Sequence, residues 1–276
     1  MTSGSPTIKA KKTALVLFSH IINPSIERLL ADLSAVSCLN FDFWMTGYFG
    51  GNSKAAINPP SPWEFYETNE ETIRALPYPN KITSVNDWET LRRNVDLPLL
   101  AFFRENSEYD NYWFIEYDVR YSGKWREFFE EFTNTDADLV CAHLTKRTSG
   151  DQWMFWGSLA SPDCAEENHI RGFLPLTRAS NRLMSCINEA YINGWSGHPE
   201  STWPTIAKAN DFSLEAIGGK GSFTPKNRQG KYYQSAYFES GVFLSTFAAW
   251  PAYSASNNFE RGHIRNYENL LWHPVK

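Results

Sequence analysis

The residues best suited to chemistry are two acids that follow an apolar segment in the middle of the chain. Residues 112–115 read Tyr-Trp-Phe-Ile, and Glu116 and Asp118 follow before Gly123. An aromatic and β-branched run that ends in acids and a glycine is typical of a buried strand whose end reaches solvent. In an extended segment, residues two apart point to the same side, so we expect Glu116 and Asp118 to converge on one hard cation. Such a cation could neutralise a diphosphate.

The simpler alternative is a strand end whose acids are solvated or paired with Arg120.

Composition narrows the function classes further. The chain has 276 residues and 42% hydrophobic content, enough for one large domain with a core. Its net charge is -5 and its basic residues are scattered, which argues against a nucleic-acid-binding surface.

The cysteines indicate a reducing, cytoplasmic location. They stand at positions 38, 141, 164 and 186 without a Cys-x-x-Cys pair, so neither a zinc knuckle nor a dense disulfide framework is predicted. We expect residues 1–12 to form a disordered leader. The apolar stretch that follows them, residues 14–18, is too short for a signal sequence or a transmembrane segment.

Aromatic residues make up 16% of the chain, with 11 tryptophans. Many rings stand among polar residues and glycines, as in Trp153-Met154-Phe155-Trp156-Gly157. Flat rings with polar edges suit the faces of sugars. Core and interface packing is the favoured explanation of any single ring, so only the group indicates carbohydrate binding.

The first half of the chain alternates between strand and helix patterns. Asn23 and Pro24 give a helix-start signal before an apolar stripe at Ile26, Leu29, Leu30 and Leu33. Strands are predicted over 13–18, 41–45, 82–85, 112–116 and 138–142, with a long loop over 50–62 and helices after Asp87, over 97–105 and over 125–132. This alternation predicts an α/β fold with a mostly parallel central sheet and a site at the carboxyl ends of its strands.

The second half is less regular and rich in aromatic residues. We predict a loop over 171–177, a helix over 179–191, a loop over 194–200, a helix that starts between 201 and 204 and runs to 210, and a strand over 214–217. Short strands and loops are expected from 222 to 276.

Together these residues resemble the GT-A glycosyltransferase fold. The features that carry the resemblance are the strand over 13–18, the acids at 116–118, a glycine near 172, an acid at 200 before a helix and a late histidine. The stretch 115–123 followed by Trp125 is similar to a sparsely characterised family of GT-A-like proteins in fungi and bacteria. The resemblance covers about 13–276 and implies a single Rossmann-like domain, with a nucleotide-sugar-binding half at 13–145 and an acceptor-binding half at 146–276.

The resemblance also implies roles for individual residues. Glu116 and Asp118 match the D-x-D motif, with Glu in the first position, and would hold Mn or Mg together with His273. The donor, a nucleotide-diphosphate sugar, would contact Ser19, His20, Glu116, Arg120, Gly172 and Lys276. The ordinary structural explanations are a turn glycine at 172, a frayed terminal histidine and a solvent-facing lysine.

Glu200, according to the resemblance, is the catalytic base of an inverting transfer to a hydroxyl of a glycan or glycolipid acceptor. A carboxylate at the start of a helix, stabilised by the helix dipole, is the equal alternative. Transfer from such a donor needs charge neutralised on the departing diphosphate and a base on the acceptor hydroxyl.

Two further function classes stay open. A sugar nucleotidyltransferase would also use a nucleotide-binding sheet and a metal, but it usually has a glycine-rich loop with basic residues where this chain reads Ser-His-Ile-Ile-Asn over 19–23. A non-catalytic carbohydrate-binding protein would explain the aromatic residues. Nucleic-acid partners and a transmembrane segment are not expected, whereas peripheral membrane contact, the donor sugar and the oligomeric state are left open by the sequence.

Overall fold

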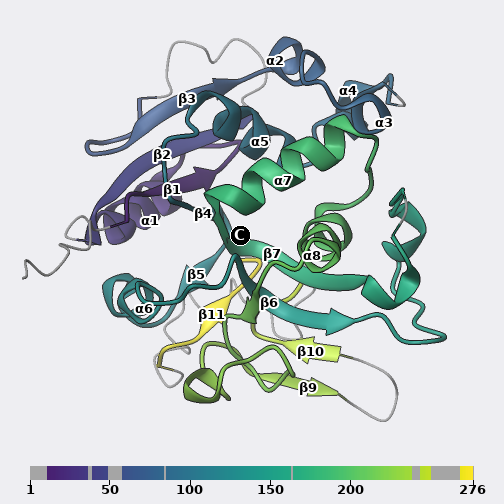
Figure 1. The fold of residues 1–276 in the computed structure, drawn as a ribbon. Helices are drawn as coiled ribbons and strands as arrows, with labels where there is room; N and C mark the ends of the chain where they lie inside the picture. Colours follow the sequence, from purple (N-terminus) through teal and green to yellow (C-terminus); the bar gives the residue numbers. More distant parts are fainter. Residues whose placement is uncertain are drawn as a thin grey trace, which may run out of the picture.

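The computed structural model describes residues 11–36, 39–48, 58–83, 85–162, 164–237, 243–249 and 268–275. These residues form a seven-stranded central sheet with helices on both faces (Figure 1). The strand order is β3-β2-β1-β4-β7-β6-β8. The strands are β1 (Thr13–Phe18), β2 (Phe41–Tyr48), β3 (Glu64–Thr68), β4 (Asn111–Glu116), β6 (Leu139–Lys146), β7 (Ile170–Ser180) and β8 (Leu214–Ala216).

All strands of this sheet except β7 run in the same direction. The four strands from β3 to β4 are parallel, β7 is antiparallel to both of its neighbours, and β8 is parallel to β6. The predicted α/β fold with a mostly parallel sheet is therefore confirmed.

The sheet separates two hydrophobic cores, because successive side chains of a strand point to opposite faces. In β1, Ala14 and Val16 belong to one core and Leu15 and Leu17 to the other. The first core is covered by α5 (Asp96–Glu105), α7 (Asn181–Ile192) and α8 (Pro199–Ala209), and the second by α1 (Pro24–Ser34) and α6 (Trp125–Glu131).

Several predicted elements are found with nearly the expected bounds. Helix α1 starts where predicted, because the Asn23 side chain accepts hydrogen bonds from the backbone N–H groups of Ser25 and Ile26. The predicted stripe of this helix is its buried face. The predictions for β1, β4, α5, α6, α7 and β8 are also confirmed within two or three residues.

Two predicted elements are wrong. The strand predicted over 82–85 is absent, because Pro79 starts the short helix α3 (Pro79–Ile82) and so fixes a helical turn there. The loop predicted over 171–177 is part of β7, an inner strand bonded to β4 and β6. Strand β3 and the short helix α2 (Glu70–Arg74) were not predicted, and the helix after Asp87 is only the single turn α4 (Trp88–Leu91).

The C-terminal part is irregular, as predicted, and it contributes short strand pairs. Strands β9 (Ser235–Tyr237) and β10 (Phe243–Ser245) pair with each other, and β11 (Leu271–Trp272) pairs with β5 (Arg120–Tyr121). Single turns of 3₁₀ helix occur as η3 (Trp156–Ser158), η4 (Glu166–Asn168) and η5 (Lys226–Arg228). Within the described ranges, no helix combines the length and apolar character needed to cross a bilayer.

The predicted leader and the division into two halves are not settled by this architecture. Residues 1–10 lie outside the described residues. Lys12 is already fixed before β1, since its backbone N–H donates to Asp110 Oδ2 over 2.8 Å.

Candidate active site

The site is built where the strand order changes direction between β1 and β4. The chain moves from β1 to β2 on one side of β1 and reaches β4 on the other, so a crevice opens at the carboxyl ends of β1 and β4. The parallel register pairs Phe18 with Glu116. The segment after β1, with Ser19 and His20, therefore lies beside the two acids, as the sequence predicted.

The two acids converge through a turn rather than through an extended strand. Strand β4 ends at Glu116, and the backbone N–H of Val119 donates to the Glu116 carbonyl over 3.1 Å. The guanidinium of Arg120 fixes this turn by donating to the carbonyls of Tyr117 and Val119 over 2.7 and 2.8 Å. Arg120 also donates to Ser25 Oγ at the start of α1, over 2.8 Å. The contacts of Arg120 are thus with the protein's own backbone and α1.

His273 reaches the acids because β11 pairs with β5 directly after the acidic turn. The backbone N–H of Val275 donates to the Asp118 carbonyl over 2.8 Å, which fixes the chain on the far side of the histidine. His273 Nε2 lies 3.3 Å from Asp118 Oδ1 and 3.7 Å from Glu116 Oε2. Its ring packs edge to face against Phe173 and Phe247, which also contact each other.

These three side chains fit a divalent metal. One ligand atom from each lies within 4.8 Å of the others, and no second such cluster occurs in the described part of the chain. Asp118 Oδ1 is buried without a hydrogen bond of good geometry, and its ion-pair partner is His273 Nε2, 3.3 Å away; a buried carboxylate needs such a cation or a metal beside it. His273 Nδ1 is 3.0 Å from the Ala248 carbonyl. A ring N–H donated there leaves Nε2 as the metal-binding atom, the usual outer-shell arrangement of a metal-ligating histidine.

The charge balance of the cluster depends on what His273 carries. Burial alone would lower the pKa of His273, but the carboxylates of Asp118 and Glu116 raise it to about 10. The imidazolium therefore balances the acids when no metal is bound. A metal would have to displace that proton, because only the neutral ring is a ligand.

Glu200 lies in the first turn of α8, close to the acids. Its side chain is 14% exposed. Burial and then the negative charge of Glu116 raise the pKa of Glu200 to about 8, although Leu174 N–H, His273 and Arg171 act in the opposite direction. The helix-start position that the sequence left as an alternative is real, but the carboxyl is buried rather than stabilised as a solvated charge. A carboxyl with such a pKa suits proton transfer.

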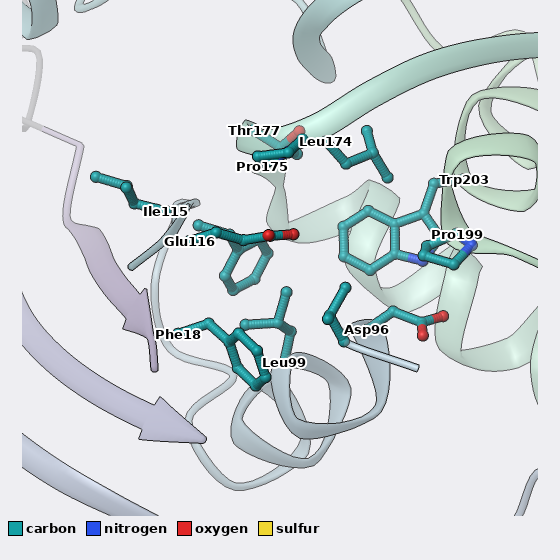
Figure 2. A pocket seen from close by; sticks show the side chains of 12 residues that line it. Phe18, Asp96, Leu99, Ile115, Glu116, Leu174, Pro175, Thr177, Pro199 and Trp203 are labelled. Atoms are coloured by element: carbon teal, nitrogen blue, oxygen red, sulfur yellow. The ribbon is translucent and has the colours of Figure 1, made fainter. Parts of the chain in front are cut away.

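A narrow, mostly apolar pocket adjoins the acids on the α8 side. Figure 2 shows the Glu116 carboxylate directed into this pocket toward Trp203, with Phe18 and Leu99 nearby. The pocket also reaches Asp96 on α5 and Pro199 beside Glu200. Glu116 thus faces a space that connects β4 with the start of α8.

A buried ion pair behind this pocket holds α8 in place. Lys81 and Asp96 have side chains only 2% and 1% exposed and form a direct hydrogen bond. Lys81 Nζ also donates to the carbonyl of Gly197 over 2.9 Å, and Tyr191 OH donates to Asp96 Oδ2 over 2.7 Å. Burial lowers the pKa of Lys81, against the opposing effect of Asp96. The pair fixes the chain just before Glu200.

The other predicted donor-binding residues have local contacts. Ser19 is buried and its Oγ donates to the Ile21 carbonyl over 2.7 Å. His20 is exposed, and its ring meets that of Tyr117 edge to face with centroids 4.7 Å apart. Lys276 lies outside the described residues.

Gly172 is not in a loop beside the site, in contrast to the prediction. It is buried within β7, where an added Cβ would lie 2.7 Å from Cys141 Sγ and 3.3 Å from Pro204 Cγ. The close approach of α8 and β6 explains a glycine at this position.

Sequence reasoning missed the groups that position Glu200. His198 is the N-cap of α8, and its Nδ1 lies 3.9 Å from Glu200 Oε2. The pair His198-Pro199 was a readable helix-start signal. Lys81 and Asp96 carry no such signal, because only the tertiary structure brings α3 and α5 to α8.

Comparisons with known proteins support no assignment of an activity. A family model described as "Protein of unknown function (DUF3405)" matches residues 59–148, less than half of the chain. This range includes Glu116 and Asp118 but not Glu200 or His273. No curated protein matches.

Among solved structures, mouse xyloside xylosyltransferase 1 shares 11% identity over 76% of this chain and 86% of its own, with a TM-score of 0.41. Glucosyl-3-phosphoglycerate synthase from Mycobacterium tuberculosis, solved with Mn²⁺, uridine diphosphate and phosphoglyceric acid, shares 13% identity over 88% of both chains, with a TM-score of 0.37. A candidate glucose-1-phosphate thymidylyltransferase from Bacillus anthracis shares 11% identity over 74% of this chain and 85% of its own, with a TM-score of 0.40. Both enzyme classes considered from the sequence are represented among them.

Proposed function

We propose that this protein is a metal-dependent glycosyltransferase that moves a sugar from a nucleotide-diphosphate donor to a hydroxyl of a carbohydrate acceptor. One observation carries the proposal. Asp118 has a buried oxygen 3.3 Å from His273 Nε2 beside Glu116, and a further, largely buried carboxyl, Glu200, lies close enough to feel the charge of Glu116. A metal site beside a carboxyl with a raised pKa is what such a transfer requires.

The three cluster residues would hold the cation. A mixed set of two carboxylates and one imidazole favours Mn²⁺ over Mg²⁺, which prefers oxygen ligands. When bound there, the cation would supply positive charge to the departing diphosphate.

Glu200 would act as the base and the transfer would invert the anomeric carbon. Its ionised carboxylate accepts the proton of the acceptor hydroxyl as the oxygen attacks. The pKa of about 8 matches a base that works near neutral pH. His198 and the buried pair of Lys81 and Asp96 would position it.

The two other classes fit the site less well. A non-catalytic protein would leave the acids as solvated loop residues, yet Asp118 is 5% exposed and the Glu200 side chain 14%. A nucleotidyltransferase must bind the phosphates of a nucleoside triphosphate, yet residues 19–23 after β1 include no Lys or Arg. Glu200, as a base beside the metal cluster, favours sugar transfer to a hydroxyl acceptor over nucleotidyl transfer.

A thermal-shift panel tests the proposal. Uridine, guanosine and thymidine diphosphate sugars are compared with the corresponding nucleoside triphosphates, each with and without Mn²⁺. We expect at least one nucleotide sugar to raise the melting temperature only when Mn²⁺ is present. A response to triphosphates alone would favour the nucleotidyltransferase, and no response to any nucleotide would favour the non-catalytic protein.

A further inference from the structure

The connection between β6 and β7 carries an aromatic run beside α8 (Figure 1). Trp156 is 6% exposed and anchors the run, and the ring centroid of Trp153 lies 5.0 Å from it. Trp153 and Phe155 meet edge to face at 5.2 Å and stay half-buried. Met154, between them, is 76% exposed, which makes it an exposed large hydrophobic side chain among the described residues. The run therefore presents apolar surface to solvent.

This run is fixed to the segment that precedes Glu200. Ala160 and Ser196 exchange backbone hydrogen bonds of 2.9 and 3.1 Å, and the backbone N–H of His198 donates to Ser158 Oγ over 3.0 Å. Gly197 permits the close approach. Its φ is +132°, and an added Cβ would lie 2.6 Å from the Ser158 carbonyl oxygen. The aromatic run is thus a built part of the structure next to α8.

Two residues, His198 and Arg171, connect the aromatic run to Glu200. The Phe155 ring stacks on the His198 ring, with centroids 3.7 Å apart and an interplanar angle of 4°, and His198 Nδ1 is 3.9 Å from Glu200 Oε2. On the other side, the Arg171 guanidinium lies 5.4 Å from the centre of the Trp153 ring. The positive charge of Arg171 also acts on the Glu200 carboxyl. The rings and Glu200 therefore share two neighbours, His198 and Arg171.

The surroundings of the rings select the class of molecule. Arg171, which lies over one face of the Trp153 ring, forms a partly exposed ion pair with Asp151 at 3.7 Å, so the surface joins apolar side chains to both donors and acceptors. A pyranose ring has matching chemistry, with an apolar C–H face and hydroxyls around its edge. The carboxylate of Asp151 and the net charge of the chain, -5, disfavour binding to an anionic membrane surface.

We infer that Trp153, Met154 and Phe155 form a binding platform for a neutral pyranose ring of the carbohydrate acceptor. The assignment of this sugar as the acceptor rests on the proposed function. The platform would hold the ring by its apolar face while Arg171 and Asp151 contact its hydroxyls. The hydroxyl to be glycosylated would then point toward Glu200.

The test is a titration followed on ¹⁵N-labelled tryptophan indoles. The Trp153 signal is identified by its loss in Trp153→Phe, and the Trp44 indole, which donates to Tyr109 OH in the opposite part of the sheet, serves as the internal control. The probes are maltotriose, cellotriose, mannotriose, xylotriose and chitotriose, and vesicles containing an anionic phospholipid are the competing probe. We expect at least one trisaccharide to shift the Trp153 signal and leave the Trp44 signal unchanged.

The variants decide what the shift means. Trp153→Ala should raise the Kd of that trisaccharide about 10-fold, as expected for losing an aromatic contact. Met154→Gln should raise the Kd by a smaller factor and should not unfold the protein, because the Met154 side chain is exposed. No shift with any trisaccharide, a shift with vesicles only, or equal affinity in Trp153→Ala would overturn the platform. Since none of these measurements uses a nucleotide, Mn²⁺-dependent donor binding can stand or fail separately.

Discussion

His273 Nε2 lies 3.3 Å from Asp118 Oδ1, although one residue is in the middle of the chain and the other near its end. The contact depends on the pairing of β11 with β5 and on the hydrogen bond from Val275 N–H to the Asp118 carbonyl. The ligand set is therefore complete only when the C-terminal segment is in place. Metal affinity should report on that segment as well as on the acids.

Asp118→Asn should lower Mn²⁺ affinity by at least about 100-fold, since it removes a charge that would bind the metal directly, and losing a group that only orients a ligand already costs 10- to 100-fold. Calorimetry with Mn²⁺ measures the effect. Asp136→Asn is the matched control, because its side chain is 94% exposed and far from the cluster. Equal affinity in Asp118→Asn and the control would remove Asp118 from the metal site.

His273→Gln should weaken Mn²⁺ binding about 10-fold or more and leave the melting temperature within a few degrees of the wild-type value. This variant is a cleaner test than deleting residues 271–276. Leu271 and Trp272 are buried, so the deletion would also remove core packing. A melting temperature that falls while metal affinity is unchanged would make His273 a structural residue.

Glu200→Gln should lower turnover by about 10² or more and leave donor and Mn²⁺ affinity unchanged, because only proton acceptance is lost. In the wild type, the base acts when ionised, so the rate should rise with pH through the pKa of about 8 and level off above it. Saturating Mn²⁺ should move this rise in rate to lower pH, because the cation offsets the negative charge of Glu116 that helps to raise the pKa of Glu200.

Initial rates from pH 6 to 10 and the anomeric configuration of the product check this prediction. Glu89→Gln is the control, with a side chain that is 62% exposed. Near-normal turnover in Glu200→Gln or retention of configuration would exclude Glu200 as the base of an inverting reaction. Asp163, Glu166, Glu167 and Glu239 would then be the next acids to test; positions 163 and 239 lie outside the described residues.

The sequence was informative where local patterns decide structure. Asn23 and the stripe of α1, the apolar run of β1 and the acids at the end of β4 could all be read from neighbours in the chain. The nearness of Glu116 and Asp118 was predicted from their spacing at a strand end, whereas a place for Glu200 beside them was implied only by the resemblance. The convergence of the acids was right, but its cause is the turn fixed by Arg120.

The failures concern structure that depends on distant residues. Residues 171–177 read as a loop because Gly172 and Pro175 interrupt the pattern, yet bonds to β4 and β6 make them an inner strand. Gly172 owes its identity to packing against Cys141 and Pro204, which no local pattern shows. Lys81 resembles an ordinary surface lysine until α3 brings it to Asp96.

The buried pair of Lys81 and Asp96 should behave as a unit. Lys81→Met alone should lower the free energy of unfolding by about 3–5 kcal/mol, because it leaves the Asp96 charge buried and uncompensated. The double variant Lys81→Met with Asp96→Leu should recover most of this loss, since no charge remains buried and Tyr191 OH keeps its 2.7 Å contact with Thr202 Oγ1. Urea unfolding measures both. A double variant no more stable than Lys81→Met would contradict the prediction.

Gly172 gives a test that separates packing from donor binding. Gly172→Ala should lower the free energy of unfolding by about 1–3 kcal/mol through overpacking, because its Cβ would lie 2.7 Å from Cys141 Sγ inside the sheet. Gly157→Ala is the matched control, since no atom lies within 4 Å of the Cβ position there. Combining Gly172→Ala with Cys141→Gly should recover part of the loss. If Gly172→Ala instead lowers donor affinity at unchanged stability, the role that the resemblance implied for Gly172 would be restored.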